Sequence, residues 1–442
     1  MTEPRYTSFG AICEHSAFGP RFSSEEYASD GNVACLRTMD IDANGRIAFD
    51  AMPLAKLDLS RLRNHLLRNG DLVITRTGAY LGKAAVFTEF RLPVLAGAFS
   101  IYFRVKREIA DPVFVRYFFN SSTGQEAIQS VATGSAQPNL NIPGLHSLRI
   151  PLPPLAEQRA IARVLGALDD KIELNRRLNR SLEELAQAVF RSWFVDFDPV
   201  TAKSSGRPPV GLDPATAELF PNQFQDSELG LIPKGWGVAS VGEVIEGLYD
   251  GPHATPPDSN DGPVFLGIKN LTGTSIDLTE IRHISESDWP RWTRRVEPTE
   301  GDIVFTYEAT IGFFALIPPG LRCCLGRRLA LVRPSRTLPH VRDFLFHTFI
   351  SDPFQILIES RVVRGSTVDR TSLLEFPNFR FVWPGDAIRA AFARTVAPLW
   401  NQIHTIQVES HSLAAARDAL LPPLLSGELR VPDAERFVEG LI

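Results

Sequence analysis

Two long stretches of the chain carry apolar residues at alternating spacings of four and three. The first stretch has one run at Ile161, Leu165, Leu168 and Ile172 and a second at Leu178, Leu182, Leu185 and Val189, with a change of register at Asn175. The second stretch holds the same alternation from Phe392 to Leu420. This spacing is typical of coiled coils, so we predict two helices of roughly 35–40 residues, each about 50–60 Å long.

Neither apolar stripe can be buried by its own helix alone. We favour an antiparallel pairing of the two helices as a coiled-coil spacer, and the alternative is that each helix packs on its neighbouring domain. The predicted packing residues are Ile161, Leu165, Leu168, Ile172, Leu178, Leu182, Leu185, Val396, Leu399, Ile403, Ile406, Leu413 and Leu420. The polar residues Asn175, Ser410 and Arg417 in these stripes are expected to fix the register of the pair.

Outside these stretches, short apolar runs bounded by glycine and polar residues predict strands. The expected strands are Val33–Leu36, Leu72–Thr75, Lys83–Thr88 and Ala98–Val105, and later Val264–Ile268, Ile303–Thr306, Phe313–Ile317 and Arg328–Val332. Short helices are expected at Val113–Asn120 and Val341–Ser351. The pattern indicates mixed α+β domains rather than a βαβ sheet.

The chain repeats itself at a spacing of 231 residues. Residues 70–75 read GDLVIT and residues 301–306 read GDIVFT. Asp30-Gly31, Gly134-Ser135 and Pro153 match Asp261-Gly262, Gly365-Ser366 and Pro384 at the same spacing. Several separated matches at one offset indicate duplication of a unit of about 230 residues. The fold expected is therefore α+β, with two pseudo-twofold-related domains joined by the two long antiparallel helices.

The repeat and the helical stretches divide the chain into six predicted segments. They are a first domain at 1–152, a central helix at 153–197, a proline-rich extended connector at 198–236, a second domain at 237–385, a distal helix at 386–427, and a short peripheral tail at 428–442.

Composition narrows the class of protein. Of the 442 residues, 44% are hydrophobic and 22% charged, which are ordinary globular values. A formal net charge of −5 argues against a protein that coats nucleic acid non-specifically. The four cysteines lack C-x-x-C spacing, so reduced thiols and no metal site are expected. With no signal-like start and no apolar run of about 20 residues, we expect a cytoplasmic protein without a membrane partner.

Motifs that would carry catalysis are missing. Residues 78–84 read GAYLGKA, which has one residue too few between its glycines for a phosphate loop and lacks the metal-binding Ser or Thr. No N-P-P-Y or D-P-P-Y motif of amino-methyltransferases is visible, and the nine histidines show no H-E-x-x-H spacing. We predict that the chain is not an enzyme and that any activity comes from partners.

Several segments carry a resemblance to a known family. Residues 151–161 read PLPPLAEQRAI, 169–175 read DDKIELN, and 190–197 read FRSWFVDF. Residues 231–236 read LIPKGW and 419–429 read ALLPPLLSGEL. Together these resemble the specificity subunit of type I restriction–modification systems over nearly the whole chain. Two departures are a first domain that starts without the Trp-containing segment and Pro384–Ala387, which lacks the Glu-Gln pair.

The resemblance implies a role in reading double-stranded DNA. In that family each target-recognition domain reads one half of a bipartite site, and the helices set the gap between the halves. The helices also dock two methyltransferase subunits, and restriction–translocase subunits complete the complex. S-adenosylmethionine, ATP and Mg²⁺ are then expected in the partner subunits, with no cofactor in this chain.

Candidate DNA contacts are Arg, Lys, amide and hydroxyl side chains in loops, since Arg reads guanine, Asn and Gln read adenine, and Lys, Ser and Thr bind phosphate. They are Arg76, Lys83, Ser135, Gln137, Asn139 and Asn141 in the first copy, and Arg327, Arg328, Arg361, Arg364, Ser366, Thr367 and Arg370 in the second. The loops differ between copies while the framework repeats, which predicts an asymmetric site.

Three alternatives stay open at this point. One is a coiled-coil scaffold that touches no nucleic acid, and it predicts little dependence on salt. Another is a methyltransferase or nuclease with built-in recognition, which the missing motifs disfavour. The third is a specificity component of a complex that only methylates DNA.

Overall fold

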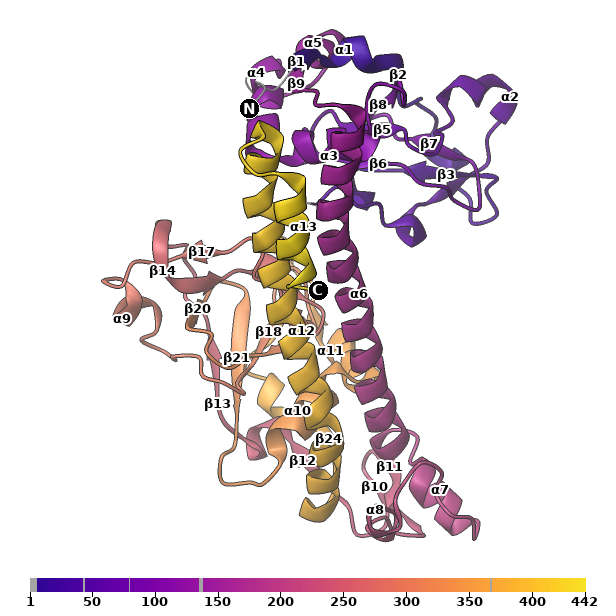
Figure 1. The fold of residues 1–442 in the computed structure, drawn as a ribbon. Coiled ribbons are helices and arrows are strands. Elements are labelled where there is room, and N and C mark those ends of the chain that lie inside the picture. Colours follow the sequence, from indigo (N-terminus) through magenta and orange to yellow (C-terminus); the bar gives the residue numbers. More distant parts are fainter. Residues whose placement is uncertain (1–5, 43, 79, 135–137, 366–367) are drawn as a thin grey trace. The chain divides into compact units, whose positions relative to one another are not determined.

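The computed structural model describes residues 6–42, 44–78, 80–134, 138–365 and 368–442, which form two compact units (Figure 1). Unit 1 comprises Met1–Leu174 and Ser410–Ile442, and unit 2 comprises Asn175–Glu409. Two long helices, α6 (Leu155–Phe194) and α12 (Asp386–Ser426), contribute one half to each unit. No helix in the described ranges combines the length and apolar character needed to cross a bilayer.

The recognition part of unit 1 is built on two small sheets. A four-stranded antiparallel sheet has the order β2-β8-β5-β6, and a three-stranded sheet has the order β4-β3-β7, in which β3 and β7 run parallel. The strands are β1 (Tyr6–Ser8), β2 (Cys13–Phe18), β3 (Val33–Leu36), β4 (Leu54–Ala55), β5 (Leu72–Thr75), β6 (Ala84–Val86), β7 (Val94–Ala96), β8 (Ser100–Val105) and β9 (Arg149–Pro151). The shorter helices are α1 (Phe9–Ile12), α2 (Leu59–Leu62), α3 (Pro112–Asn120), α4 (Ser122–Val131), α5 (Ile142–Ser147) and α13 (Val431–Glu439).

Unit 2 repeats this plan. Its four-stranded sheet has the order β13-β21-β18-β19, and its three-stranded sheet has the order β17-β14-β20, in which β14 and β20 run parallel. The strands are β10 (Phe224–Ser227), β11 (Gly230–Pro233), β12 (Gly237–Ser240), β13 (Ile245–Asp250), β14 (Ser259–Leu266), β15 (Leu271–Thr272), β16 (Ser275–Ile276), β17 (Arg282–His283), β18 (Ile303–Thr306), β19 (Phe314–Leu316), β20 (Cys323–Leu325), β21 (Leu329–Pro334), β22 (Val362–Val363), β23 (Arg370–Thr371) and β24 (Arg380–Trp383). The shorter helices are α7 (Asp198–Ser204), α8 (Pro214–Glu218), α9 (Trp289–Trp292), α10 (Val341–Ile350) and α11 (Asp352–Ser360).

The matching sheet orders confirm the predicted α+β fold with two related domains. Strands β5 and β18 follow the repeated Gly-Asp motif, and both are buried along their whole length because each separates two layers. Leu72 and Ile74 face the core that contains the long helices, whereas Val73 faces the core of the smaller sheet. In unit 2, Ile303 likewise faces the core that contains the long helices, and Val304 faces the core of the smaller sheet. Alternation of side chains along a strand produces this division.

The long helices pack in opposite directions. In unit 1, Asp169 of α6 pairs with Arg417 of α12, and in unit 2 Phe190 of α6 packs on Phe392 with ring centroids 5.6 Å apart. The buried stripe of the first half of α6 consists of Ile161, Leu165, Leu168 and Ile172, as predicted. The opposing buried residues on α12 include Val396, Ile403, Ile406, Leu413 and Leu420.

The predicted stripe is wrong for part of the second half of α6. Leu178 and Leu185 were expected to pack, but they are 43% and 51% exposed. The buried face is instead formed by Ala186, Phe190, Trp193 and Phe194. Phe190 and Phe194 pack edge-to-face against Phe392 and Phe344, and burial of such large side chains determines which face of the helix turns inward.

The segment expected to be an extended connector and the tail expected to be peripheral both contribute to the cores. The connector 198–236 is not simply extended, because it folds into α7, α8 and the β10–β11 hairpin and buries Phe220, Ile232 and Trp236 in unit 2. The tail beyond Gly427 forms α13, whose Ala434 and Val438 are buried in the core of unit 1.

Candidate nucleic-acid interface

Three segments meet where β5 ends in unit 1. The backbone N–H of Arg76 donates to the carbonyl of Phe99 at 2.9 Å, and the N–H of Leu140 donates to the carbonyl of Arg76 at 2.9 Å. The side chain of Arg76 donates through Nε to Asn139 Oδ1 at 3.0 Å, and its guanidinium lies 4.5 Å from the ring centroid of Phe18. Two predicted DNA contacts, Arg76 and Asn139, are therefore held side by side.

The same three segments meet where β18 ends in unit 2. The N–H of Tyr307 donates to the carbonyl of Arg328 at 3.2 Å, and the N–H of Thr371 donates to the carbonyl of Tyr307 at 2.8 Å. Arg370 pairs with Glu308 through an isolated β-bridge. Burial is the main cause that raises the pKa of Tyr307 to about 12. Predicted contacts Arg328 and Arg370 are thus brought together.

We call these sets the reading platforms: Arg76, Phe99 and Asn139 in unit 1, and Tyr307, Arg328 and Arg370 in unit 2. The backbone hydrogen bonds that join the segments are alike in both units, whereas the side chains differ at each of the three positions. Arg328 has φ of +73°, a conformation that is costly for a residue with a side chain and is concentrated at functional sites.

The remaining predicted DNA contacts lie in varied surroundings. Ser135, Gln137, Ser366 and Thr367 lie outside the described residues. Asn141 accepts a hydrogen bond from the N–H of Gly144 at 2.8 Å, so its side chain caps α5. Lys83 is half-buried, whereas Arg327, Arg361 and Arg364 are exposed, the last of these 3.5 Å from Glu359.

In each unit, a hairpin of the globular part forms hydrogen bonds with both long helices. In unit 1, Arg46 donates to Glu173 of α6 at 2.6 Å, and Arg417 of α12 donates to Asn44 at 3.1 Å. In unit 2, Thr274 donates to Glu183 of α6 at 2.6 Å, and Gln407 of α12 donates to Ser275 at 3.4 Å. The helices therefore orient the recognition domain of each unit through polar contacts.

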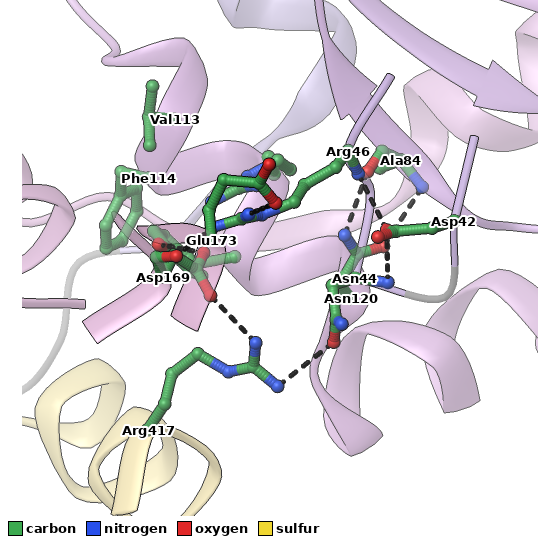
Figure 2. A network of polar contacts seen from close by, with 12 residues as sticks. Asp42, Asn44, Arg46, Ala84, Val113, Phe114, Asn120, Asp169, Glu173 and Arg417 are labelled. Carbon is green, nitrogen blue, oxygen red and sulfur yellow. Dashed lines mark hydrogen bonds and ion pairs between the residues drawn. The ribbon is translucent and has the colours of Figure 1, made fainter. Parts of the chain in front are cut away.

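Asp169 is the centre of the network in unit 1. Figure 2 shows Arg417 reaching from α12 to Asp169 and Asn44, close to Arg46 and Glu173. The carboxylate of Asp169 is 5% exposed and accepts hydrogen bonds from Arg417 at 2.8 Å, Tyr117 at 2.6 Å and Arg116 at 3.1 Å. Burial alone would raise the pKa of Asp169, but Arg116, Tyr117 and Arg417 together hold it below its ordinary value.

The corresponding place in unit 2 is uncharged. His347 and Trp400 stand 231 residues after Arg116 and Asp169, and the indole N–H of Trp400 donates to His347 Nε2 at 3.1 Å. His347 Nδ1 donates to the carbonyl of Asp343 at 2.7 Å, so both ring nitrogens are engaged in the neutral form. Burial lowers the pKa of His347 to about 4. One copy uses charge where the other uses aromatic packing.

Sequence reasoning missed several residues at these sites. Phe99 and Tyr307 flank strands and were not considered for contact, although the repeat offset aligns Tyr307 with Arg76. The basic run at 289–295, WPRWTRR, was also passed over. Its arginines lie in unit 2 and line a surface cavity.

Comparisons with known proteins agree on one family. Residues 8–184 match the type I restriction modification DNA specificity domain. The chain is 28% identical over 332 residues to the type I restriction enzyme MjaIX specificity subunit of Methanocaldococcus jannaschii, covering 72% of this chain and 69% of that protein. It is 24% identical over 377 residues to the HindI specificity subunit of Haemophilus influenzae, covering 72% and 77%.

A solved structure supports the fold. The type I restriction–modification S subunit from M. genitalium superposes with a TM-score of 0.51, covering 96% of this chain and 97% of that one at 15% identity. The motifs, the duplicated domains, the paired helices and these matches agree: residues 8–184 match the type I restriction modification DNA specificity domain, and the chain is similar over most of its length to specificity subunits of type I restriction enzymes.

Proposed function

We propose that the two units read the two halves of an asymmetric, bipartite DNA site. The observation that carries this proposal is the pair of reading platforms, which share a backbone framework and differ in all three side chains. Two identical readers related by a twofold axis select a palindrome, so two different readers select unlike half-sites.

The chemistry of the platforms suits base recognition. Arg76 presents a planar donor group that matches the acceptors of guanine, and the amide of Asn139 matches the donor and acceptor of adenine. Unit 2 offers Tyr307, Arg328 and Arg370 instead. Phe18 and Asn139 hold the Arg76 side chain in place, which lowers the conformational entropy that binding must remove.

The helices α6 and α12 set the distance between the half-sites in this proposal. With 40 and 41 residues, each is about 60 Å long at 1.5 Å per residue. The Asp169 network in unit 1 and the hydrogen bond from Asn175 to Glu409 in unit 2, at 2.7 Å, oppose sliding of one helix along the other. Polar groups in a helix seam commonly fix register.

We further propose that exposed faces of these helices dock two methyltransferase subunits, with restriction–translocase subunits completing the complex. Leu178 and Leu185 on α6 are largely exposed although they lie on a helix that packs elsewhere. Exposed apolar side chains on one element mark protein contacts. S-adenosylmethionine, ATP and Mg²⁺ then belong to the partners. Leu178→Glu with Leu185→Glu should abolish co-purification of the methyltransferase, and normal co-purification would contradict this surface.

Domain exchange tests the modular proposal. Residues 1–152 are replaced by the first domain of another family member, and the methylated motif is determined by methylome sequencing of cells that carry the intact system. One half of the motif should change and the other should persist, because each platform is built within its own unit. A change in both halves would contradict modular recognition.

A further inference from the structure

A cavity of about 340 Å³ in unit 2 is lined by several side chains that donate hydrogen bonds. Its lining consists of Pro252, His253, Ala254, Arg291, Trp292, Arg294 and Arg295. Three guanidinium groups therefore face a single hollow in a chain whose net charge is −5. Guanidinium groups have no acceptor atoms, so the lining favours an anionic or strongly accepting ligand.

Two of these arginines are not neutralised within the fold. The guanidinium groups of Arg291 and Arg294 have no ion-pair or hydrogen-bond partner among the residues that the structure describes. Arg295 pairs with Asp250, which also lies 3.0 Å from His253 Nε2. The carboxylate of Asp250 is thus already engaged by Arg295 and His253, and the charges of Arg291 and Arg294 stay available.

An independent feature is the indole of Trp292. This residue is 5% exposed, and its N–H has no hydrogen-bond partner in the described part of the chain. A buried donor without a partner is costly, so such groups are few in native proteins. Trp292 is also one of the residues that line the cavity.

The cavity adjoins the reading platform of unit 2. Gly251 precedes the cavity residue Pro252, and its N–H donates to the carbonyl of Leu329 at 2.9 Å. Leu329 directly follows the platform residue Arg328. A group bound in the cavity would therefore lie next to the groups proposed to read bases. The first copy retains a basic residue at the matching position, since Arg63 stands 231 residues before Arg294.

We propose that this cavity binds a phosphodiester of the DNA backbone beside the second half-site. The proposal rests on the DNA-reading function and adds a named phosphate site to it. Contacts to phosphate position a protein on the duplex without selecting sequence, and each one adds a release of counterions to binding. Arg291 and Arg294 supply the charge, while Asp250 keeps Arg295 and His253 in place.

The test measures binding of the full-length chain to duplex DNA across a series of salt concentrations. The variant Arg291→Gln with Arg294→Gln is compared with Arg207→Gln with Arg394→Gln, which removes the same charge from exposed positions of unit 2 on other elements. The first variant should weaken binding to its own site and to unrelated duplex by the same factor. Its salt slope should fall by about 0.9, the contribution of the one phosphate that is no longer neutralised. The control should retain the wild-type slope.

Two outcomes would overturn the proposal. The first is an unchanged salt slope in the cavity variant. The second is a shift of the melting temperature by inorganic phosphate that the variant abolishes while its DNA slope stays at the wild-type value, because the cavity would then bind free phosphate only. Failure of the reading proposal is distinguishable, since unrelated duplex reports on the cavity even if no sequence preference exists.

Discussion

At the scale of single residues, the two copies bury different polar side chains where α6, α12 and a shorter helix pack together. Asp169 in unit 1 is buried with three donors around its carboxylate, and His347 in unit 2 is buried as a neutral ring between Trp400 and Asp343. A buried charge needs all its partners, because desolvation exceeds what one ion pair returns. Removing Asp169 should therefore lower the free energy of unfolding more than removing an exposed carboxylate does.

Asp169→Ala should lower the free energy of unfolding by about 3–5 kcal/mol, since it leaves Arg116 buried without its counter-charge and leaves Arg417 with only the exposed Asp418 as a partner. Denaturant titration measures the effect. The matched control is Asp30→Ala in the same unit, where the pair with Lys56 is exposed and screened by solvent, so its loss should have little effect. If the two variants lost the same free energy of unfolding, the Asp169 network would not stabilise the packing of α6 on α12 in unit 1.

His347 gives a dependence on pH. The unfolded imidazole gains its proton near its ordinary pKa, whereas the folded one stays neutral down to about 4. Stability is thus complete above that ordinary value and falls as pH drops toward 4, by about 3 kcal/mol at most. Thermal unfolding between pH 7.5 and 4.5 tests this, with His347→Gln as a variant that cannot titrate. A variant with the same pH slope as the wild type would refute the assignment.

At the scale of elements, the repeated Gly-Asp turn explains why the strands were predictable. Gly70 has φ of +88° and Gly301 has φ of +84°, and the aspartates that follow accept hydrogen bonds from the backbone N–H groups of Arg68 and Thr299, three residues earlier. The turn needs glycine for its left-handed backbone and aspartate for its polar contacts. Both requirements are local, so they are visible in the sequence.

Gly70→Ala should destabilise the protein by roughly 1–3 kcal/mol, because alanine is strained at that φ and its Cβ would clash with the guanidinium of Arg107. The same change at Gly166, inside α6 with open space around it, should stabilise by about 0.5–1 kcal/mol. Urea midpoints of the two variants should move in opposite directions. Movement in the same direction would contradict the role assigned to the turn.

Other elements were not predictable because their burial depends on distant partners. Leu178 and Leu185 fit a helical stripe as well as Phe190 and Trp193 do, and contact with Phe344 and Phe392 decides which set is buried. Only some of the platform residues were predicted from the sequence. Arg76, Asn139, Arg328 and Arg370 follow from the chemistry of base reading, whereas Phe99 and Tyr307 join them through backbone contacts between segments remote in sequence.

At the scale of the whole molecule, the chain contains two reading platforms with different side chains and one pair of long helices. In the proposed function, the reading platforms supply the specificity and the long helices set the separation between the half-sites. A helix of fixed length is a spacer only if its register is fixed, which is the role of the Asp169 network and of the Asn175–Glu409 hydrogen bond. The gap in the DNA site should then follow the length of the helices.

The most direct test removes one heptad from each helix, residues 176–182 of α6 and 402–408 of α12, so that Asn175 and Glu409 are kept, and determines the methylated motif by methylome sequencing. Seven residues span about 10 Å of helix, which corresponds to roughly three base pairs of DNA. The account predicts that both half-sites keep their sequence while the gap between them shortens by about that amount. A gap of unchanged length in an active system would contradict it.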